Sequence, residues 1–269
     1  MVIDMDFGAI ITAVLVISLV GILIGLFLGI AGLKLKVDVD PKEEQVVNAL
    51  PGNNCGGCGY AGCSALAAAI VKGEAAVGGC PVGGDKVAKE IAKIMGVEAG
   101  ESVRMTAYVK CAGDCDKATS DYEYSGVQDC RMLQFVPNGG PKACNYGCLG
   151  YGSCVKECPF DAIHLENGIA VVDKDKCKAC GKCVAVCPKH IIEMIPYDAA
   201  YVVACSSNEK GPVVMKECQV GCIGCGICRK NCPSDAIDVT DFLAKIDPEK
   251  CIACGTCKDK CPKKTIHQH

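Results

Sequence analysis

A long apolar run opens the chain. From Phe7 to Leu33 there is no charged residue, and Thr12 and Ser18 are the polar interruptions. An apolar run of this length is enough to cross a bilayer as one helix. A cleaved signal peptide, the alternative, would have a basic start and a shorter apolar stretch, whereas Asp4 and Asp6 precede this run. The pattern therefore predicts a single transmembrane helix.

The residues in and after this helix indicate its orientation and its role. Lys34 and Lys36 follow it directly, so the positive-inside rule places the rest of the chain in the cytoplasm. Gly21, Gly25 and Gly29 share one helical face, where they either allow a neighbouring helix to approach closely or are ordinary glycines tolerated in lipid. Because the run carries no ionisable group, we expect an anchor in the cell membrane rather than an ion pathway.

Beyond the helix, apolar positions fall into short segments. Amphipathic patterns over residues 64–72 and 86–95 predict two helices, and Tyr108-Val109 and Tyr201-Val202 indicate related strands. We therefore expect an α+β protein built from small units. These are a transmembrane anchor (1–33), a linker (34–42), an α-rich domain (43–100), a connecting segment (101–143), a first module (144–196), a second connecting segment (197–217) and a second module (218–269).

The composition adds the chemistry, because 25 of the 269 residues are cysteine while tryptophan is absent. A disulfide scaffold belongs to a short exported chain, whereas closely spaced thiols followed by proline are typical of iron-sulfur proteins. Such thiols must stay reduced, which independently favours the cytoplasm. The net charge of −3 is too small to indicate a nucleic-acid partner. With so small a core, we expect bound clusters to hold the units together and the cluster-free protein to be largely unfolded beyond its N-terminal segment.

Eight cysteines repeat without a gap at an offset of 74 residues. Flanking residues repeat too, since Cys158-Pro159 returns as Cys232-Pro233. The runs resemble the C-x2-C-x2-C-x3-C-P pattern of two-cluster ferredoxins, in which the fourth cysteine of each run binds the other cluster. Duplication of a ferredoxin module is the simplest explanation. The two sets are Cys144, Cys148, Cys154, Cys158, Cys177, Cys180, Cys183 and Cys187, and Cys218, Cys222, Cys228, Cys232, Cys251, Cys254, Cys257 and Cys261.

The ferredoxin pattern predicts the ligands of four clusters. In the second module these are Cys222, Cys225, Cys228 and Cys261 for one cluster, and Cys232, Cys251, Cys254 and Cys257 for the other. In the first module one cluster takes Cys158, Cys177, Cys180 and Cys183. The other is irregular, because Tyr151 occupies the position of Cys225. We expect Cys144 to complete the set of Cys148, Cys154 and Cys187, with Cys130 or Cys111 as alternatives.

Two further groups of thiols remain. Cys55, Cys58, Cys63 and Cys80 resemble a small domain that binds one 4Fe-4S cluster, although four cysteines alone leave zinc open. Cys111, Cys130, Cys205 and Cys218 are candidates for a sixth cluster, and the alternative is that they are free buried thiols, which behave as small hydrophobes. Cys115 is left without a set.

One anchor helix, the Cys55-x2-Cys58-x4-Cys63-x16-Cys80 domain and the ferredoxin modules, with Cys144-x3-Cys148-x5-Cys154 in the first, together resemble the B subunit of the Rnf complex. That complex is the ion-translocating ferredoxin:NAD+ oxidoreductase of bacteria, and the resemblance covers the whole chain. It implies a translocase component that relays electrons from reduced ferredoxin, through about six 4Fe-4S clusters, to membrane flavin and iron-sulfur subunits that transport Na+ or H+. NAD+ reduction falls to another subunit, in agreement with the lack of a dinucleotide-binding motif in this sequence.

Two other functions stay open on the sequence: the electron-transfer subunit of another membrane oxidoreductase such as a hydrogenase, and a membrane-tethered redox sensor or storage polyferredoxin. Five lysines near the last cysteine run form either a landing site for an acidic ferredoxin or a solvated face. They are Lys250, Lys258, Lys260, Lys263 and Lys264. No histidine is expected to be a ligand, and His267 and His269 are expected to fray with the C-terminal tail.

Overall fold

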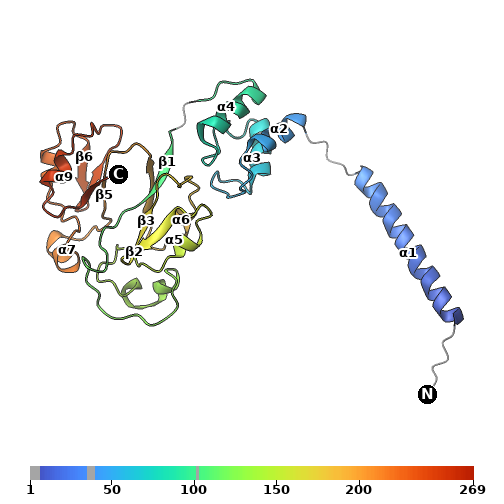
Figure 1. Cartoon of the computed structure of the whole chain (residues 1–269), viewed down its shortest axis with the longest axis horizontal. Helices are drawn as coiled ribbons and strands as arrows, with labels where there is room; N and C mark the ends of the chain where they lie inside the picture. Colours follow the sequence, from blue (N-terminus) through green and yellow to red (C-terminus); the bar gives the residue numbers. More distant parts are fainter. Residues whose placement is uncertain (1–6, 35–39, 101–102) are drawn as a thin grey trace, which may run out of the picture.

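The computed structural model describes residues 7–34, 40–100 and 103–269. A long N-terminal helix comes first, then a small helical domain, and then two units built from short helices and two-stranded sheets (Figure 1). This mixture of helices and strands agrees with the expected α+β class in its coarse form.

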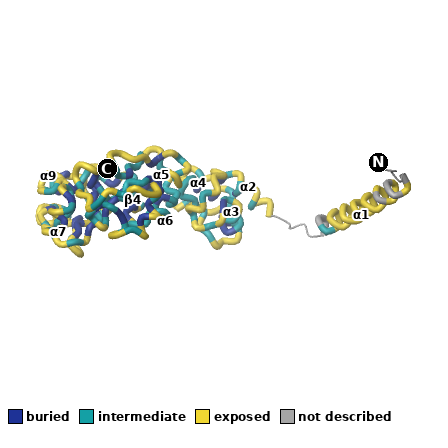
Figure 2. Tube along the Cα trace, turned by 90° about the horizontal axis from the view of Figure 1, so that it is seen from below, coloured by how far each residue is buried: buried dark blue, intermediate teal, exposed yellow. Residues whose placement is uncertain are grey.

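Helix α1 (Phe7–Lys34) carries the apolar run. Its segment Val14–Ala31 has a mean hydropathy of 2.9 and is 0% buried within the chain. The side chains of Ile17 and Phe27 are each 72% exposed, and Figure 2 draws the helix as exposed along its described length. A helix that is apolar on all sides needs an apolar environment, and this one is long enough to span a bilayer. It is therefore a candidate membrane span.

The helical domain contains α2 (Pro41–Ala49), α3 (Cys63–Val71) and α4 (Gly84–Met95). Helices α3 and α4 confirm the two predicted helices to within two residues at each end. Helix α2 begins inside the expected linker, because the Asp40 side chain accepts a hydrogen bond from Lys42 N at 2.8 Å and caps its first turn. Residues 35–39, the greater part of that linker, lie outside the described residues.

The core of this domain is small. Val46, Leu66, Ile70 and Ile91 are each no more than 2% exposed, and they come from all three helices. Thiols of the cysteine loop pack against the edge of this cluster. So few apolar side chains bury little surface, which leaves the cysteine loop dependent on whatever its thiols bind.

The two ferredoxin modules pair their strands in the same way. In the first, β1 (Met105–Val109) pairs with β4 (Ile192–Pro196), and β2 (Ile163–Glu166) pairs with β3 (Ile169–Val172). In the second, β5 (Tyr201–Val203) pairs with β8 (Ile266–Gln268), and β6 (Ile237–Thr240) pairs with β7 (Leu243–Ile246). All four pairs are antiparallel. The 74-residue offset of the cysteines is preserved in the strand register, since Ile163↔Val172 returns as Ile237↔Ile246.

Each cysteine run continues into a short helix that contains one of its thiols: α5 (Ser153–Lys156), α6 (Lys182–Val186), α8 (Ile227–Lys230) and α9 (Thr256–Lys260). Each begins after a glycine in the left-handed region, with φ between 70° and 77°. Glycine adopts this conformation at little cost, so each run can turn sharply from loop into helix around its thiols. Helix α7 (Gly211–Glu217) lies between β5 and the cysteine runs of the second module.

Both modules begin earlier than expected, because the segments 101–143 and 197–217 contain β1 and β5. These strands agree with the tyrosine-valine pairs in the sequence. Strand β8 in turn shows that the expectation of a frayed tail was wrong, since His267 pairs with Val202 and His269 N donates to Ala200 O at 3.1 Å. Backbone pairing with β5 holds the last residues in place.

One segment distinguishes the first module from the second. Cys111 lies 33 residues before Cys144, whereas Cys205 lies 13 before Cys218, so the first module carries 20 more residues here. The extra chain forms a loop over residues 120–142, which we call the insertion, and a bridge between Ser120 and Lys142 closes it. It contains the short 3-10 helices η1 (Met132–Phe135) and η2 (Pro137–Gly139).

Candidate iron-sulfur sites

The thiols of the second module surround a cavity and an exposed loop. The cavity is lined by the first predicted set, Cys222, Cys225, Cys228 and Cys261. The second predicted set lies at the other end of the module, where Cys257 feels the charges of Cys251 and Cys254, and Cys254 that of Cys232. Cys254 is exposed, so this second set reaches the protein surface.

The first module also contains a regular set, because one cavity is lined by Cys158, Cys177, Cys180 and Cys183. Its irregular site differs from expectation. The thiols that line the second cavity are Cys130, Cys148, Cys154 and Cys187. Cys130, one of the two alternatives to Cys144, therefore lines the cavity where Cys144 was expected. The insertion brings Cys130 to the gap that Tyr151 leaves in the cysteine pattern.

Local hydrogen bonds hold Cys130 in this position. Ser153, the first residue of α5, accepts a bond from Cys130 N at 2.8 Å through Oγ and donates to Asp129 Oδ1 at 2.8 Å. The Arg131 guanidinium, hydrogen-bonded to Asp129, holds the pKa of that carboxyl well below its usual range. Ser153 is 2% exposed, so these bonds lie out of water where an unmade bond is costly. The insertion is thus fixed to the helix that carries Cys154.

Cys144 instead lies in a cavity between the two modules. The thiols that line this cavity are Cys111, Cys144, Cys205 and Cys218. The expected sixth set contained Cys130, whereas this cavity has Cys144 in that place. Cys111 and Cys144 come from the first module, and Cys205 and Cys218 from the second. We call this the shared site, because neither module alone supplies four thiols.

The shared site has equivalent surroundings on both sides. Cys111 follows β1 by two residues and Cys205 follows β5 by two residues. The Cys111 Sγ accepts a hydrogen bond from Cys148 N at 3.3 Å, and the Cys205 Sγ accepts one from Cys222 N at 3.3 Å. The pair Cys148 and Cys222 is itself related by the 74-residue repeat. The two modules therefore contribute equivalent halves of one site.

The helical domain carries its four thiols on the loop before α3 and just before α4. Cys63 N donates to Asn54 Oδ1 at 2.8 Å, which fixes the turn into α3. Cys80 feels the charges of Cys55 and Cys63. This loop contacts the first module: a Cβ on Gly57 would lie 2.5 Å from Cys180 O, so glycine is required for the approach.

Three observations test whether these residues fit iron-sulfur clusters. Among the residues that the structure describes, no three Cys, His, Asp or Glu side chains converge closely enough to hold a single ion, and the thiols instead face shared cavities. Backbone amides donate to several sulfurs, including Ala162 N to Cys158 at 3.5 Å and its repeat, Ala236 N to Cys232 at 3.3 Å. Such N-H···S bonds stabilise ligand thiolates in iron-sulfur proteins. The donor set fits 4Fe-4S clusters.

Burial gives the thiols of the metal-free chain a strong preference for the protonated form. It raises the pKa of Cys144, Cys154 and Cys183 to about 12 and that of Cys148 to about 11. Because thiolates are the metal ligands, loading must release protons, and without metal these sulfurs are neutral groups that line cavities.

Thiol-lined cavities repeated on ferredoxin-type loops define an iron-sulfur protein of the electron-transfer class. Comparison with protein families agrees: an Fe-S cluster family matches residues 50–82, and two families of 4Fe-4S dicluster domains match residues 137–200 and 221–265. The matched ranges cover the cysteine loop of the helical domain and the repeated cysteine runs of both modules, without β1 and β5. They support 4Fe-4S clusters as the cofactors.

Similarity extends beyond single domains. The chain is 47% identical over 244 residues, 90% of its length and 73% of the relative's, to the B subunit of the Na(+)-translocating ferredoxin:NAD(+) oxidoreductase complex of Acetobacterium woodii. It is 44% identical to the B subunit of the ion-translocating oxidoreductase complex of Methanosarcina acetivorans, over 90% of this chain and 92% of the other. It is 42% identical to the B subunit of the proton-translocating ferredoxin:NAD(+) oxidoreductase complex of Clostridium ljungdahlii, over 89% of this chain and 85% of the relative. The chain belongs to the B-subunit family of ion-translocating oxidoreductase complexes.

One feature of the sequence could have identified the shared site. Cys144 and Cys218 are related by the 74-residue repeat, and Cys218 was already grouped with Cys205. Equivalent residues are expected to have equivalent surroundings, so Cys144 belonged in the same set. The position of Cys130 had no comparable signal, because the insertion has no counterpart in the second module. Cys115 is exposed and lies outside all of these sets.

Proposed function

We propose that the chain holds six 4Fe-4S clusters in one continuous row and relays electrons along it from reduced ferredoxin to membrane-bound subunits of the same complex. Each cluster, when bound, takes up and releases one electron. The names of the relatives support ferredoxin as donor, NAD+ as final acceptor and Na+ or H+ as the transported ion. The metal ligands of this proposal are the six thiol sets described above, which use 24 of the 25 cysteines.

The observation that carries the proposal is that consecutive thiol sets lie near one another along the chain. The helical domain meets the first module at Gly57 and Cys180. Within that module, Cys154 feels the charge of Cys183 of the neighbouring set. The amides of Cys148 and Cys222 then bond to the two sides of the shared site. These observations link the first five sets along the chain, and the last set lies in the same module as the fifth.

The two ends of the row suit different partners. The helical domain directly follows the candidate membrane span, and Lys34 and Lys36 support a cytoplasmic location for everything beyond it. At the other end, Cys254 is exposed, and Ile252 beside it is 62% exposed. Lys258 and Lys260 on α9 are exposed near this end, with Asp259 between them. We assign ferredoxin docking to this surface, where the lysines would steer an acidic donor.

Iron analysis and redox-titrated electron paramagnetic resonance test the proposal. Anaerobically purified full-length chain is expected to contain about 24 iron atoms, since each 4Fe-4S cluster carries four. A measured content of about 20 iron atoms would show that one of the six proposed clusters is absent. Solubilised in mild detergent, the chain is expected to co-purify with hydrophobic partner subunits, and rapid reduction by ferredoxin is expected in that complex. A chain that arrives alone and is not reduced by ferredoxin would refute the assignment.

A further inference from the structure

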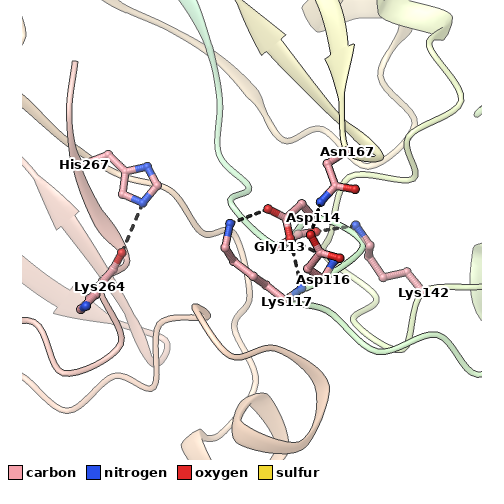
Figure 3. Close-up of polar contacts among 8 residues, drawn as sticks. All are labelled: Gly113, Asp114, Asp116, Lys117, Lys142, Asn167, Lys264 and His267. Carbon is pink, nitrogen blue, oxygen red and sulfur yellow. Dashed lines mark hydrogen bonds and ion pairs between the residues drawn. The ribbon is translucent and has the colours of Figure 1, made fainter.

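The shared site contains a buried lysine. Lys142 lines the same cavity as Cys111, Cys144, Cys205 and Cys218, and it is 9% exposed. Its Nζ donates to Gly113 O at 2.6 Å and to Cys148 O at 2.8 Å. Figure 3 shows the side chain extended toward the backbone of Gly113. The ammonium is therefore held between the cavity and the chain that leads to Cys148.

Within the described part of the chain, this ammonium has no carboxylate partner. Among the residues that the structure describes, no Asp or Glu oxygen lies within ion-pair distance of Lys142 Nζ. Asp114, one residue from Gly113, is bonded to Lys117 instead. A buried charge is strongly unfavourable unless an opposite charge compensates it. Lys142 lines the cavity of the four shared thiols and bonds to the backbone of Cys148, so the ligand thiolates of a bound cluster would supply the compensating negative charge.

We propose that Lys142 raises the reduction potential of the shared site. Reduction adds one negative charge, and a fixed positive charge in a water-poor cavity stabilises the reduced form more than the oxidised one. Hydrogen bonds to two carbonyls keep the ammonium from swinging out to solvent. This role of Lys142 rests on the proposed function, because it requires a cluster at the four shared thiols.

The repeat supplies a comparison within the same molecule. The residue 74 positions after Lys142 is Lys216, which is exposed in the last turn of α7. Water screens an exposed charge, so Lys216 has little influence on the site even though it precedes Cys218 by the same two residues as Lys142 precedes Cys144. The effect is thus assigned to a buried lysine of one repeat and not to lysine at this position in general.

Redox-titrated electron paramagnetic resonance of the full-length chain tests the inference. Lys142→Met is expected to leave about 24 iron atoms per chain and to lower the midpoint of the signal that Cys205→Ala removes. At the wild-type midpoint, the ratio of oxidised to reduced shared site should rise about tenfold, equivalent to 59 mV for one electron. Lys142→Arg, which keeps the charge, and Lys216→Met should both stay near the wild-type value.

The outcomes separate the two proposals. A Cys205→Ala chain that loses neither iron nor a signal relative to the wild-type chain refutes the shared cluster itself. An unchanged midpoint in a fully loaded Lys142→Met chain refutes the role of Lys142 alone, as does an equal shift in Lys216→Met. If Lys142→Met does not bind its full set of clusters, the midpoint of Lys142→Gln tests the role of the charge instead, because the glutamine amide is an uncharged hydrogen-bond donor.

Discussion

Cys130 supplies the ligand that is missing at Tyr151, and mutation can move this ligand back to position 151. Cys130→Ala is expected to remove the fourth ligand of the set Cys148, Cys154 and Cys187 and to reduce the iron content by about four atoms per chain. Adding Tyr151→Cys should restore it. The loop there is built like that of the second module: Gly150 and Gly152 have φ of 78° and 72°, and Gly224 and Gly226, which flank Cys225, have 63° and 70°.

The restored ligand should not restore the stability of the insertion. When Cys130 and Cys148 bind the same cluster, they close a loop of 18 residues, which stabilises the fold by about 3 kcal/mol through lost chain entropy. Tyr151→Cys closes a loop of three residues and leaves the insertion without its covalent tie. The double variant should therefore regain iron but lose about 3 kcal/mol of protection against opening of residues 120–142.

Two measurements check this reasoning. Iron content and paramagnetic resonance report whether the cluster returns, and limited proteolysis reports whether the insertion opens. Tyr151→Ala in the Cys130→Ala background is the matched control. It removes the ring that packs edge-on against Tyr124, with 5.6 Å between the ring centroids, without adding a thiol. The reasoning fails if Cys130→Ala keeps all of its iron, if Tyr151→Ala restores as much as Tyr151→Cys, or if Cys144→Ala removes the same signal as Cys130→Ala.

Three further results are expected. Ser153→Ala leaves Cys130 N and Asp129 without their buried partner and should cost about 1–3 kcal/mol in the free energy of unfolding measured by denaturant titration; no change in the midpoint would contradict this. Gly57→Val should force the helical domain away from Cys180, because its Cβ would lie 2.5 Å from Cys180 O. Electron exchange between the helical domain and the first module should then be slower in stopped-flow reduction, at unchanged iron content. Gly78→Ala, whose Cβ lies 3.8 Å from its nearest atom, is the control, and equal rates in the two variants would argue against the contact. Charge reversal to Glu at Lys258, Lys260, Lys263 and Lys264 should slow reduction by ferredoxin and flatten its dependence on salt, and unchanged rates at low salt would exclude this docking surface.

Local sequence predicted what local chemistry determines. The apolar run gave α1, the amphipathic patterns gave α3 and α4, and the tyrosine-valine pairs marked β1 and β5. The regular thiol sets could be predicted for the same reason, since three of the four expected ligands in each come from one run of seven residues. In such a run, the spacing alone fixes which sulfurs can face a common point.

Long-range contacts could not be predicted in the same way. The fourth thiol of the irregular set comes from a loop with no repeat partner, and its position depends on Ser153 and Asp129, which carry no motif. Likewise, the burial of Lys142 and the exposure of Lys216 follow from the packing between modules rather than from two identical residue types. Both cases concern the interface between segments far apart in the chain, where residue spacing gives no information.

The division of the shared site between the modules has a consequence for biosynthesis. A ribosome makes Cys111 and Cys144 well before Cys205 and Cys218, whereas the helical domain has all four of its thiols once residue 80 has been made. During that interval half of the site is present without its complement. Its two thiols can then be oxidised or can bind iron incorrectly. Maturation of the nascent chain must therefore protect the middle of the protein longest, and a chain truncated before Cys218 should be more sensitive to oxygen there than one that extends past it.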